Sequence, residues 1–272
     1  MLMLAKLFSI LILLTSNSFT NEEDKNWELI WADEFNYVGA PDSLKWNYDL
    51  GDACQLGCGC GWGNNELQYY TKDLNNVFVK DGKLIITAKK ESKKNSKYTS
   101  TRLISKAKAA WKYGKIEARM KLPSGKGTWP AFWMLPEDNV YGGWPRSGEI
   151  DIMEHVGYEP TALYGTVHTK SFNHGIGTQV GDSLVVIDME KAFHTYGIEW
   201  SENKIDFYCD DEVYFTFEKK SNNSEDWPFD QKFHAILNLA VGGNWGGAKG
   251  IDENIWPQKM MVDYVRVYKM KK

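Results

Sequence analysis

The sequence of 272 residues lacks an excess of either charge, since 32 Lys and Arg residues stand against 36 Asp and Glu residues, for a net charge of −4 at pH 7. A chain with this balance has no electrostatic reason to bind nucleic acid or an anionic membrane. With 43% hydrophobic and 25% charged residues, the composition is that of a globular protein with a real core. Disordered and fibrous classes are therefore excluded.

Linkers, low-complexity tracts and internal repeats are also missing from residues 25–270. Gly and Pro residues are scattered as turn residues rather than clustered, so we expect one domain over residues 21–272. Sustained helical periodicity is nearly absent. The alternation of strands and helices that is typical of a parallel sheet is missing with it.

Short segments in which polar and apolar residues alternate take the place of helices. The clearest segments are residues 83–88, 114–122, 195–200, 205–209, 213–217 and 261–268. Turn residues separate the later ones, such as Asp210 and Asp211. Many short alternating segments between turns predict an all-β antiparallel sandwich or barrel.

The apolar run near the N-terminus is short: it covers residues 7–14, follows a single Lys6 and precedes small and polar residues. This layout is typical of a secretory signal peptide, and the run is too short to span a bilayer comfortably; a membrane anchor is the alternative. We expect a signal peptide over residues 1–20 and a secreted protein, extracellular or periplasmic, with no membrane contact after cleavage. No later segment resembles a transmembrane helix.

Cysteines are few, and three of the four, Cys54, Cys58 and Cys60, lie in one glycine-rich loop. In a secreted protein this loop could close a local disulfide from Cys54 to Cys58 or to Cys60. Zinc would need a second pair of ligands near the loop, and none is present. Cys209 lies at an apolar position of an alternating segment, which indicates a buried thiol.

Carboxylates are concentrated in residues 147–156, where Glu149, Asp151 and Glu154 alternate with apolar residues. In a strand Glu149 and Asp151 share one face, whereas Glu154 would point to the other. A one-residue bulge near Ile152 and Met153 would bring Glu154 to the same face. Neighbouring negative charge would then raise the pKa of one carboxyl group, which stays protonated as an acid while another is ionised as a nucleophile.

Two other interpretations of this segment stay open. An amphipathic strand whose acidic face is merely solvated would show the same alternation. The carboxylates together with His155 could also bind a hard cation, although a strand provides no loop that wraps around calcium.

The 12 tryptophans fit either a bulky core or a surface for a flat, polyhydroxylated ligand. Trp129 and Trp133 lie upstream of the acidic segment at an even spacing, so they share a face in an extended chain, and Trp144 directly precedes it. Rings placed in this way could stack on sugar rings, and packing in the core is the alternative. Trp200 lies in an alternating segment and is predicted to be in the core.

These segments together resemble glycoside hydrolase family 16, and within it the laminarinases, which are endo-β-1,3-glucanases. The resemblance covers nearly the whole chain after the expected signal peptide. Its motifs are the acidic segment 149–154 and residues 61–71, 125–136, 164–168, 240–245 and 262–268. It implies a β-jelly-roll of two antiparallel sheets with a concave substrate cleft, and a retaining glycoside hydrolase that acts on β-glucan as a monomer.

The resemblance also implies roles for individual residues. Glu149 would be the nucleophile, Glu154 the general acid and then base, and Asp151 the residue that holds and tunes Glu149. The expected sugar contacts are Asn64, Arg102, Trp129, Trp133, Trp144, His168 and Trp245. For His168 a structural histidine, and for Arg102 a solvated surface charge, are the alternatives.

Many relatives carry a structural calcium ion on the convex side. The matching positions are Glu34, the backbone oxygen of Gly82, and Asp263, and a solvated Asp263 is the alternative. Catalysis needs no cofactor.

Two other functions of the same fold are the alternatives to a laminarinase. A related enzyme could cleave mixed-linkage β-glucan, agar or carrageenan, but the tryptophan segment and residues 64–71 favour laminarin. A non-catalytic β-glucan-binding protein would typically lose the acidic residues, and all three are present.

Overall fold

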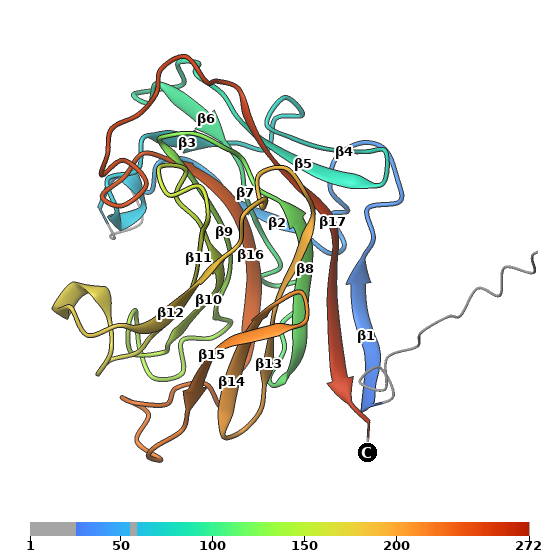
Figure 1. Ribbon diagram of the computed structural model, residues 1–272, viewed down its shortest axis with the longest axis vertical. Coiled ribbons are helices and arrows are strands. Elements are labelled where there is room, and N and C mark those ends of the chain that lie inside the picture. The colour runs from blue at the N-terminus through green and yellow to red at the C-terminus, as the bar shows by residue number, and fades with distance from the viewer. Residues whose placement is uncertain (1–25, 55–58, 272) are drawn as a thin grey trace, which may run out of the picture.

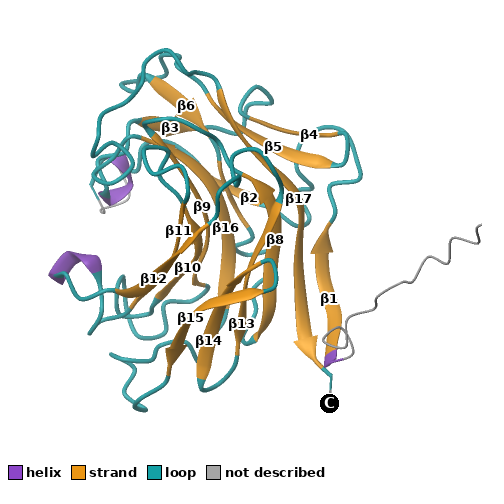
Figure 2. Cartoon of the chain, in the orientation of Figure 1, coloured by secondary structure: helices purple, strands orange, loops and turns teal. Residues whose placement is uncertain are grey.

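The computed structural model describes residues 26–54 and 59–271. The expected signal peptide and Cys58 lie outside the described residues. About half of the described residues, 48%, are in strands and 3% are in helices. Figure 2 shows strands joined by loops, with the short helices outside the sheets. Among the described residues, no helix is long and apolar enough to cross a membrane.

The first large sheet has the strand order β15-β14-β13-β8-β17-β5-β4, and β1 also pairs with β17. All of its pairings are antiparallel. Its strands are β1 (Trp27–Asp33), β4 (Val77–Lys80), β5 (Lys83–Ala88), β8 (Gly114–Lys121), β13 (His194–Trp200), β14 (Lys204–Cys209), β15 (Glu212–Glu218) and β17 (Gln258–Met270).

The second large sheet has the order β12-β11-β10-β9-β16-β7-β2 and is also antiparallel throughout. Its strands are β2 (Asn47–Asp49), β7 (Arg102–Ile104), β9 (Thr128–Pro136), β10 (Glu149–Glu154), β11 (Ala162–His168), β12 (Val180–Val185) and β16 (Phe233–Val241). A small parallel pair, β3 (Gln68–Tyr70) and β6 (Tyr98–Ser100), and two 3-10 helices, η2 (Gly61–Gly63) and η3 (His174–Ile176), complete the fold.

The two sheets are curved and stack on one another, with η2 and η3 on the open side of the second sheet (Figure 1). This arrangement confirms the predicted all-β antiparallel jelly-roll. The alternation that predicted it arises because each strand sends one set of side chains between the sheets.

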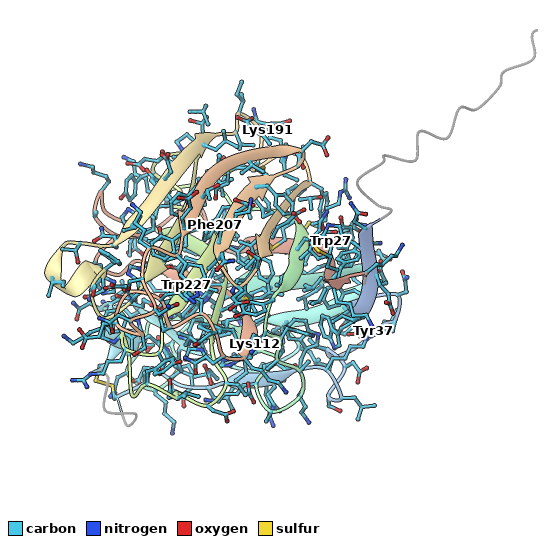
Figure 3. All side chains as sticks on the ribbon, turned by 90° about the horizontal axis from the view of Figure 1, so that it is seen from below. Trp27, Tyr37, Lys112, Lys191, Phe207 and Trp227 are labelled. Atoms are coloured by element: carbon cyan, nitrogen blue, oxygen red, sulfur yellow. A yellow bond between two sulfur atoms is a disulfide. The ribbon has the colours of Figure 1, made fainter. Side chains whose placement is uncertain are left out.

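Apolar side chains from both sheets form the core. Phe132 and Met134 of β9 and Ile150 of β10 are fully buried, as are Ile198 and Phe207 of the facing sheet. Figure 3 labels Phe207 and Trp227 within the packed interior. Trp200 is also buried, and its Nε1–H donates to the Phe229 carbonyl at 3.1 Å. The prediction that Trp200 belongs to the core is confirmed.

The cysteine loop contains a disulfide between Cys54 and Cys60. The sequence left Cys58 and Cys60 open as partners, because both lie within reach of Cys54 along the chain. Cys209 is a free, buried thiol, as its place in an alternating segment predicted.

Candidate active site

A bulge in β10 brings the carboxylates to one face of the second sheet. Asp151 pairs with Trp133 of β9, but the next pairs are Met153 with Phe132 and Glu154 with Ala131. One residue of β10 is therefore extra. Directly opposed residues share a face, and Trp133 and Ala131 are two apart on β9, so Asp151 and Glu154 point the same way.

Tryptophan and histidine side chains contact each of the three carboxylates. The Trp144 indole donates to Glu149 Oε2 at 2.6 Å, and the Trp129 indole donates to Glu154 Oε1 at 3.0 Å. His168 lies directly opposite Glu149 on β11, and its Nε2 is 3.2 Å from Asp151 Oδ2. These neighbours fix the carboxylate orientations from three different segments of the chain.

Burial raises the pKa of all three carboxyl groups. Desolvation and the neighbouring Asp151 carboxyl raise the pKa of Glu149 to about 8. Desolvation, partly offset by the Trp129 hydrogen bond, raises the pKa of Glu154 to about 7. Asp151 lies between both and has a pKa well above its ordinary value, mainly through burial. The group of three carboxyls therefore retains protons at neutral pH, as a general acid requires.

Aromatic rings lie around the acidic groups. Trp245 packs edge-on against Trp129 at 5.5 Å and against Tyr164 at 5.0 Å between ring centroids. Trp144 is 46% exposed, so much of its ring is available to a ligand. The ring also lies 4.9 Å from the His174 ring of η3 and 6.2 Å from the His168 ring, between centroids.

Arg102 is held between two indole rings rather than being a solvated surface charge. Its guanidinium carbon lies 4.6 Å from the centroids of both Trp62 and Trp133, and its Nε is 3.0 Å from Asp49 Oδ2. The Trp133 indole also donates to Asn238 Oδ1 at 2.6 Å. Trp133 is thus fixed at its ring face and at its N–H.

A hydrogen-bonded group around Glu66 was missed at the sequence level. Glu66 accepts from Gln68 Nε2 at 2.7 Å, from the Tyr70 hydroxyl at 3.3 Å and from Asn64 Nδ2 at 3.4 Å. Burial raises the pKa of Glu66, and the charge of Glu66 in turn contributes to the raised pKa of Glu154. The even spacing of Glu66, Gln68 and Tyr70 was the signal that placed them on one face.

The structure thus places the predicted site residues close to the carboxylates of β10. Direct contacts join Glu149, Asp151 and Glu154 to Trp129, Trp144 and His168, and Trp245 joins them through Trp129. Arg102 and Trp133 contact each other next to the Glu66 group that includes Asn64. His155 points elsewhere, with its Nδ1 3.0 Å from the Ala162 carbonyl, so it does not join the carboxylates as a cation ligand.

The three calcium positions lie on or next to neighbouring strands: Asp263 is in β17, Glu34 follows β1 and Gly82 precedes β5, and β17 pairs with both β1 and β5. Their carboxylates, however, are occupied by guanidinium groups. Both Glu34 oxygens accept from Arg266, at 2.7 and 2.9 Å, and Asp263 Oδ2 accepts from Arg119 at 2.6 Å. Both Glu34 oxygens and one Asp263 oxygen are thus in ion pairs, and calcium would have to compete with these arginines; the calcium site stays a prediction.

The profile of the glycosyl hydrolases family 16 matches residues 64–266. The chain belongs to glycoside hydrolase family 16. A β-glucanase of Rhodothermus marinus is 50% identical over 257 residues, which cover 92% of this chain and 87% of that protein. A glucan endo-1,3-β-glucosidase of Cryptopygus antarcticus is 44% identical, over 83% of this chain and 84% of that protein.

Solved structures agree with these relatives. The laminarinase of Rhodothermus marinus superposes with a TM-score of 0.86 at 49% identity, over 90% of this chain and 98% of that structure. Family 16 enzymes retain the anomeric configuration and need no cofactor for catalysis. The family assignment therefore supplies a reaction class for the carboxylates on β10.

We predict that Glu149→Gln changes the pH dependence of stability. Folding raises the Glu149 pKa to about 8, so the native state favours the protonated carboxyl. The free energy of unfolding of the wild type should therefore fall as the pH rises from about 4.5 towards 8, because the unfolded state ionises first. The glutamine side chain cannot ionise, so the variant should gain stability over wild type across this range, by on the order of 1 kcal/mol or more. Urea denaturation at several pH values measures the difference.

The control is Glu225→Gln, at an exposed position. The difference in the free energy of unfolding between Glu225→Gln and the wild type should not change with pH. If the gain in the free energy of unfolding of Glu149→Gln over the wild type does not change with pH, or falls as the pH rises, the raised pKa is contradicted.

Proposed function

We propose that the protein is an endo-acting hydrolase of β-1,3-glucan that retains the β-configuration through a covalent glycosyl-enzyme. The observation that supports this proposal most is the bulge of β10, which places Glu149, Asp151 and Glu154 on one face beside tryptophan rings. The names of the relatives point to the same substrate class.

In the first step, Glu154 protonates the glycosidic oxygen while a carboxylate oxygen of Glu149 attacks the anomeric carbon. The C–O bond to the leaving chain breaks, and a glycosyl ester of Glu149 forms. In the second step, Glu154 takes a proton from water, the hydroxide attacks the anomeric carbon, and Glu149 leaves as a carboxylate. Two inversions at one carbon give net retention.

The surrounding residues divide the protons between the two glutamates. Asp151 and Glu149 share a hydrogen bond, and the Asp151 carboxyl raises the pKa of Glu149, so the pair holds a shared proton. Attack by Glu149 requires this proton to lie on Asp151, and the hydrogen bond from the Trp144 N–H lowers the Glu149 pKa and favours the ionised nucleophile. Glu154, with a pKa of about 7, keeps its proton for the leaving oxygen in mildly acidic and neutral solution.

Sugar rings would stack on tryptophans and bond to polar groups along the same face. The exposed ring of Trp144, and Trp245 beside Trp129, supply apolar surface. Asn64, Arg102, Trp133 and His168 complete the proposed set of contacts.

Secretion is part of the proposal. It rests on the layout of residues 1–20 and on the Cys54–Cys60 disulfide, since disulfides persist in oxidising compartments. One chain carries every group that the mechanism uses, which supports action as a monomer.

A parallel substrate panel tests the substrate. The purified protein should release reducing sugar from laminarin as oligosaccharides, and proton NMR of the first products should show the β-anomer. Barley mixed-linkage glucan, agarose and carrageenan serve as comparisons. Activity on one of these with none on laminarin would contradict the proposed substrate, and initial α-products would contradict retention.

Carboxylate variants test the assigned roles. Glu149→Gln and Glu154→Gln should each lower kcat on laminarin by several orders of magnitude, roughly 10³-fold or more, because each removes a group that forms or breaks a bond. Circular dichroism and urea denaturation establish that each variant is folded. A folded variant with near wild-type kcat would show that its role is misassigned.

A further inference from the structure

A second group of ionisable side chains lies in the first sheet, outside the catalytic group. It is formed by His194 at the start of β13, Cys209 at the end of β14, Asp210 in the following turn, and Asp188 in the segment that precedes β13. Lys191, in the same segment as Asp188, marks one edge of the molecule in Figure 3. Nothing in the hydrolytic mechanism uses these residues.

The side chains of this group lie at the distances of metal ligands. His194 Nδ1 is 2.7 Å from Asp210 Oδ2, and one ligand atom each of His194, Cys209 and Asp210 lies within 4.8 Å of the other two. On the other side of the ring, His194 Nε2 is 3.0 Å from Asp188 Oδ1. A thiol, an imidazole and a carboxylate thus surround one point, and a second carboxylate lies behind the imidazole.

The backbone holds these donors in place. Cys209 pairs with Tyr196 in the β13–β14 ladder. Asp210 Oδ1 accepts from the Thr195 N–H at 2.8 Å, while its own N–H donates to the Thr195 carbonyl at 2.7 Å. The positive φ of 52° at Asp210 belongs to the tight turn that directs its carboxylate back towards His194. The donor set is therefore organised before any ligand binds.

An unpartnered buried group also lies near this point. Cys209 is 3% exposed, and the hydroxyl of Tyr196 is buried with no hydrogen-bond partner among the described residues. The Tyr196 ring lies 6.4 Å from the His194 ring, and its hydroxyl is in electrostatic reach of Cys209, Asp210 and Asp188. Buried polar groups without partners are rare in folded proteins and are expected where a ligand is missing.

We propose that Cys209 Sγ, His194 Nδ1 and Asp210 Oδ2 form a binding site for a zinc-type divalent cation. Sulfur, imidazole nitrogen and carboxylate oxygen are the donors that zinc takes in proteins. Asp188 Oδ1 lies 3.0 Å from His194 Nε2 and can accept its N–H, as carboxylate partners do for zinc-bound histidines. Nδ1 then binds the metal once it gives up the proton that it shares with Asp210. The exposed Asp210 leaves room for water as the fourth ligand.

Binding requires the loss of the thiol proton. Burial raises the pKa of Cys209 to about 12, so the thiol is protonated at neutral pH until a cation displaces the proton. The metal would then join the two strands and the preceding segment. It should stabilise the native state, because the unfolded chain holds these residues apart.

Cobalt and zinc serve as probes of the site. All proteins carry Cys58→Ser, so that Cys209 is the one possible thiolate beside the Cys54–Cys60 disulfide. Titration with Co²⁺ should give one equivalent of binding with a thiolate-to-cobalt absorption band, and Zn²⁺ should displace it and raise Tm. A cation at Glu149, Asp151 and His168, which also lie close together, would give no such band.

Variants assign the ligands. Cys209→Ser should abolish the band, and His194→Asn should abolish it or weaken binding at least about tenfold; Asp188→Asn should weaken binding about tenfold. The matched control is Asp211→Asn, which removes an exposed neighbouring carboxylate and should leave binding unchanged. If Cys209→Ser fails to fold, His194→Asn decides the question.

Absence of a saturable band in the Cys58→Ser protein would overturn the proposal. The same holds for a band that persists in His194→Asn with unchanged affinity, and for an equal loss in Asp211→Asn. Each of these results would mean that Cys209, His194 and Asp210 do not form the metal site as proposed, and that His194 is an ion-pair partner of Asp188 and Asp210.

Discussion

Repulsion between carboxyl groups buried on one face of β10 is the constraint on which the rest of the site depends. Three such groups cannot all ionise away from water, so they must share protons and accept hydrogen bonds. The fold meets this demand with donors from elsewhere in the chain: Trp129 on β9, Trp144 before β10, and His168 on β11. The raised pKa values that make burial costly also supply the acid.

The jelly-roll makes this arrangement possible because β10 lies inside a sheet, between β9 and β11. Both neighbours pair with it through the bulge, so the extra residue is fixed on two sides. Its apolar residues, among them Ile150 and Met153, are buried in the core behind the carboxylates. Core packing on one face thus sets the positions of charged groups on the other.

Features set by local pattern could be predicted from the sequence, whereas features set by long-range pairing could not. Alternation identified the strands, and the misplaced parity of Glu154 indicated the bulge. The position of Arg102 between Trp62 and Trp133 depends on the pairing of β7 with β16 and on η2, which no local pattern reports. The ion pairs of Glu34 and Asp263 likewise join residues far apart in the chain, which is why the calcium expectation missed them.

The central claim is that Glu149 becomes covalently bound to the sugar while Glu154 does not. A 2-deoxy-2-fluoro β-1,3-glucooligosaccharide with an activated leaving group slows the second step more than the first, so the glycosyl-enzyme should accumulate. Peptide mass spectrometry of the inactivated protein should then find the added sugar on Glu149. A label on Glu154 or Asp151, or turnover of the reagent without any covalent adduct, would contradict the account.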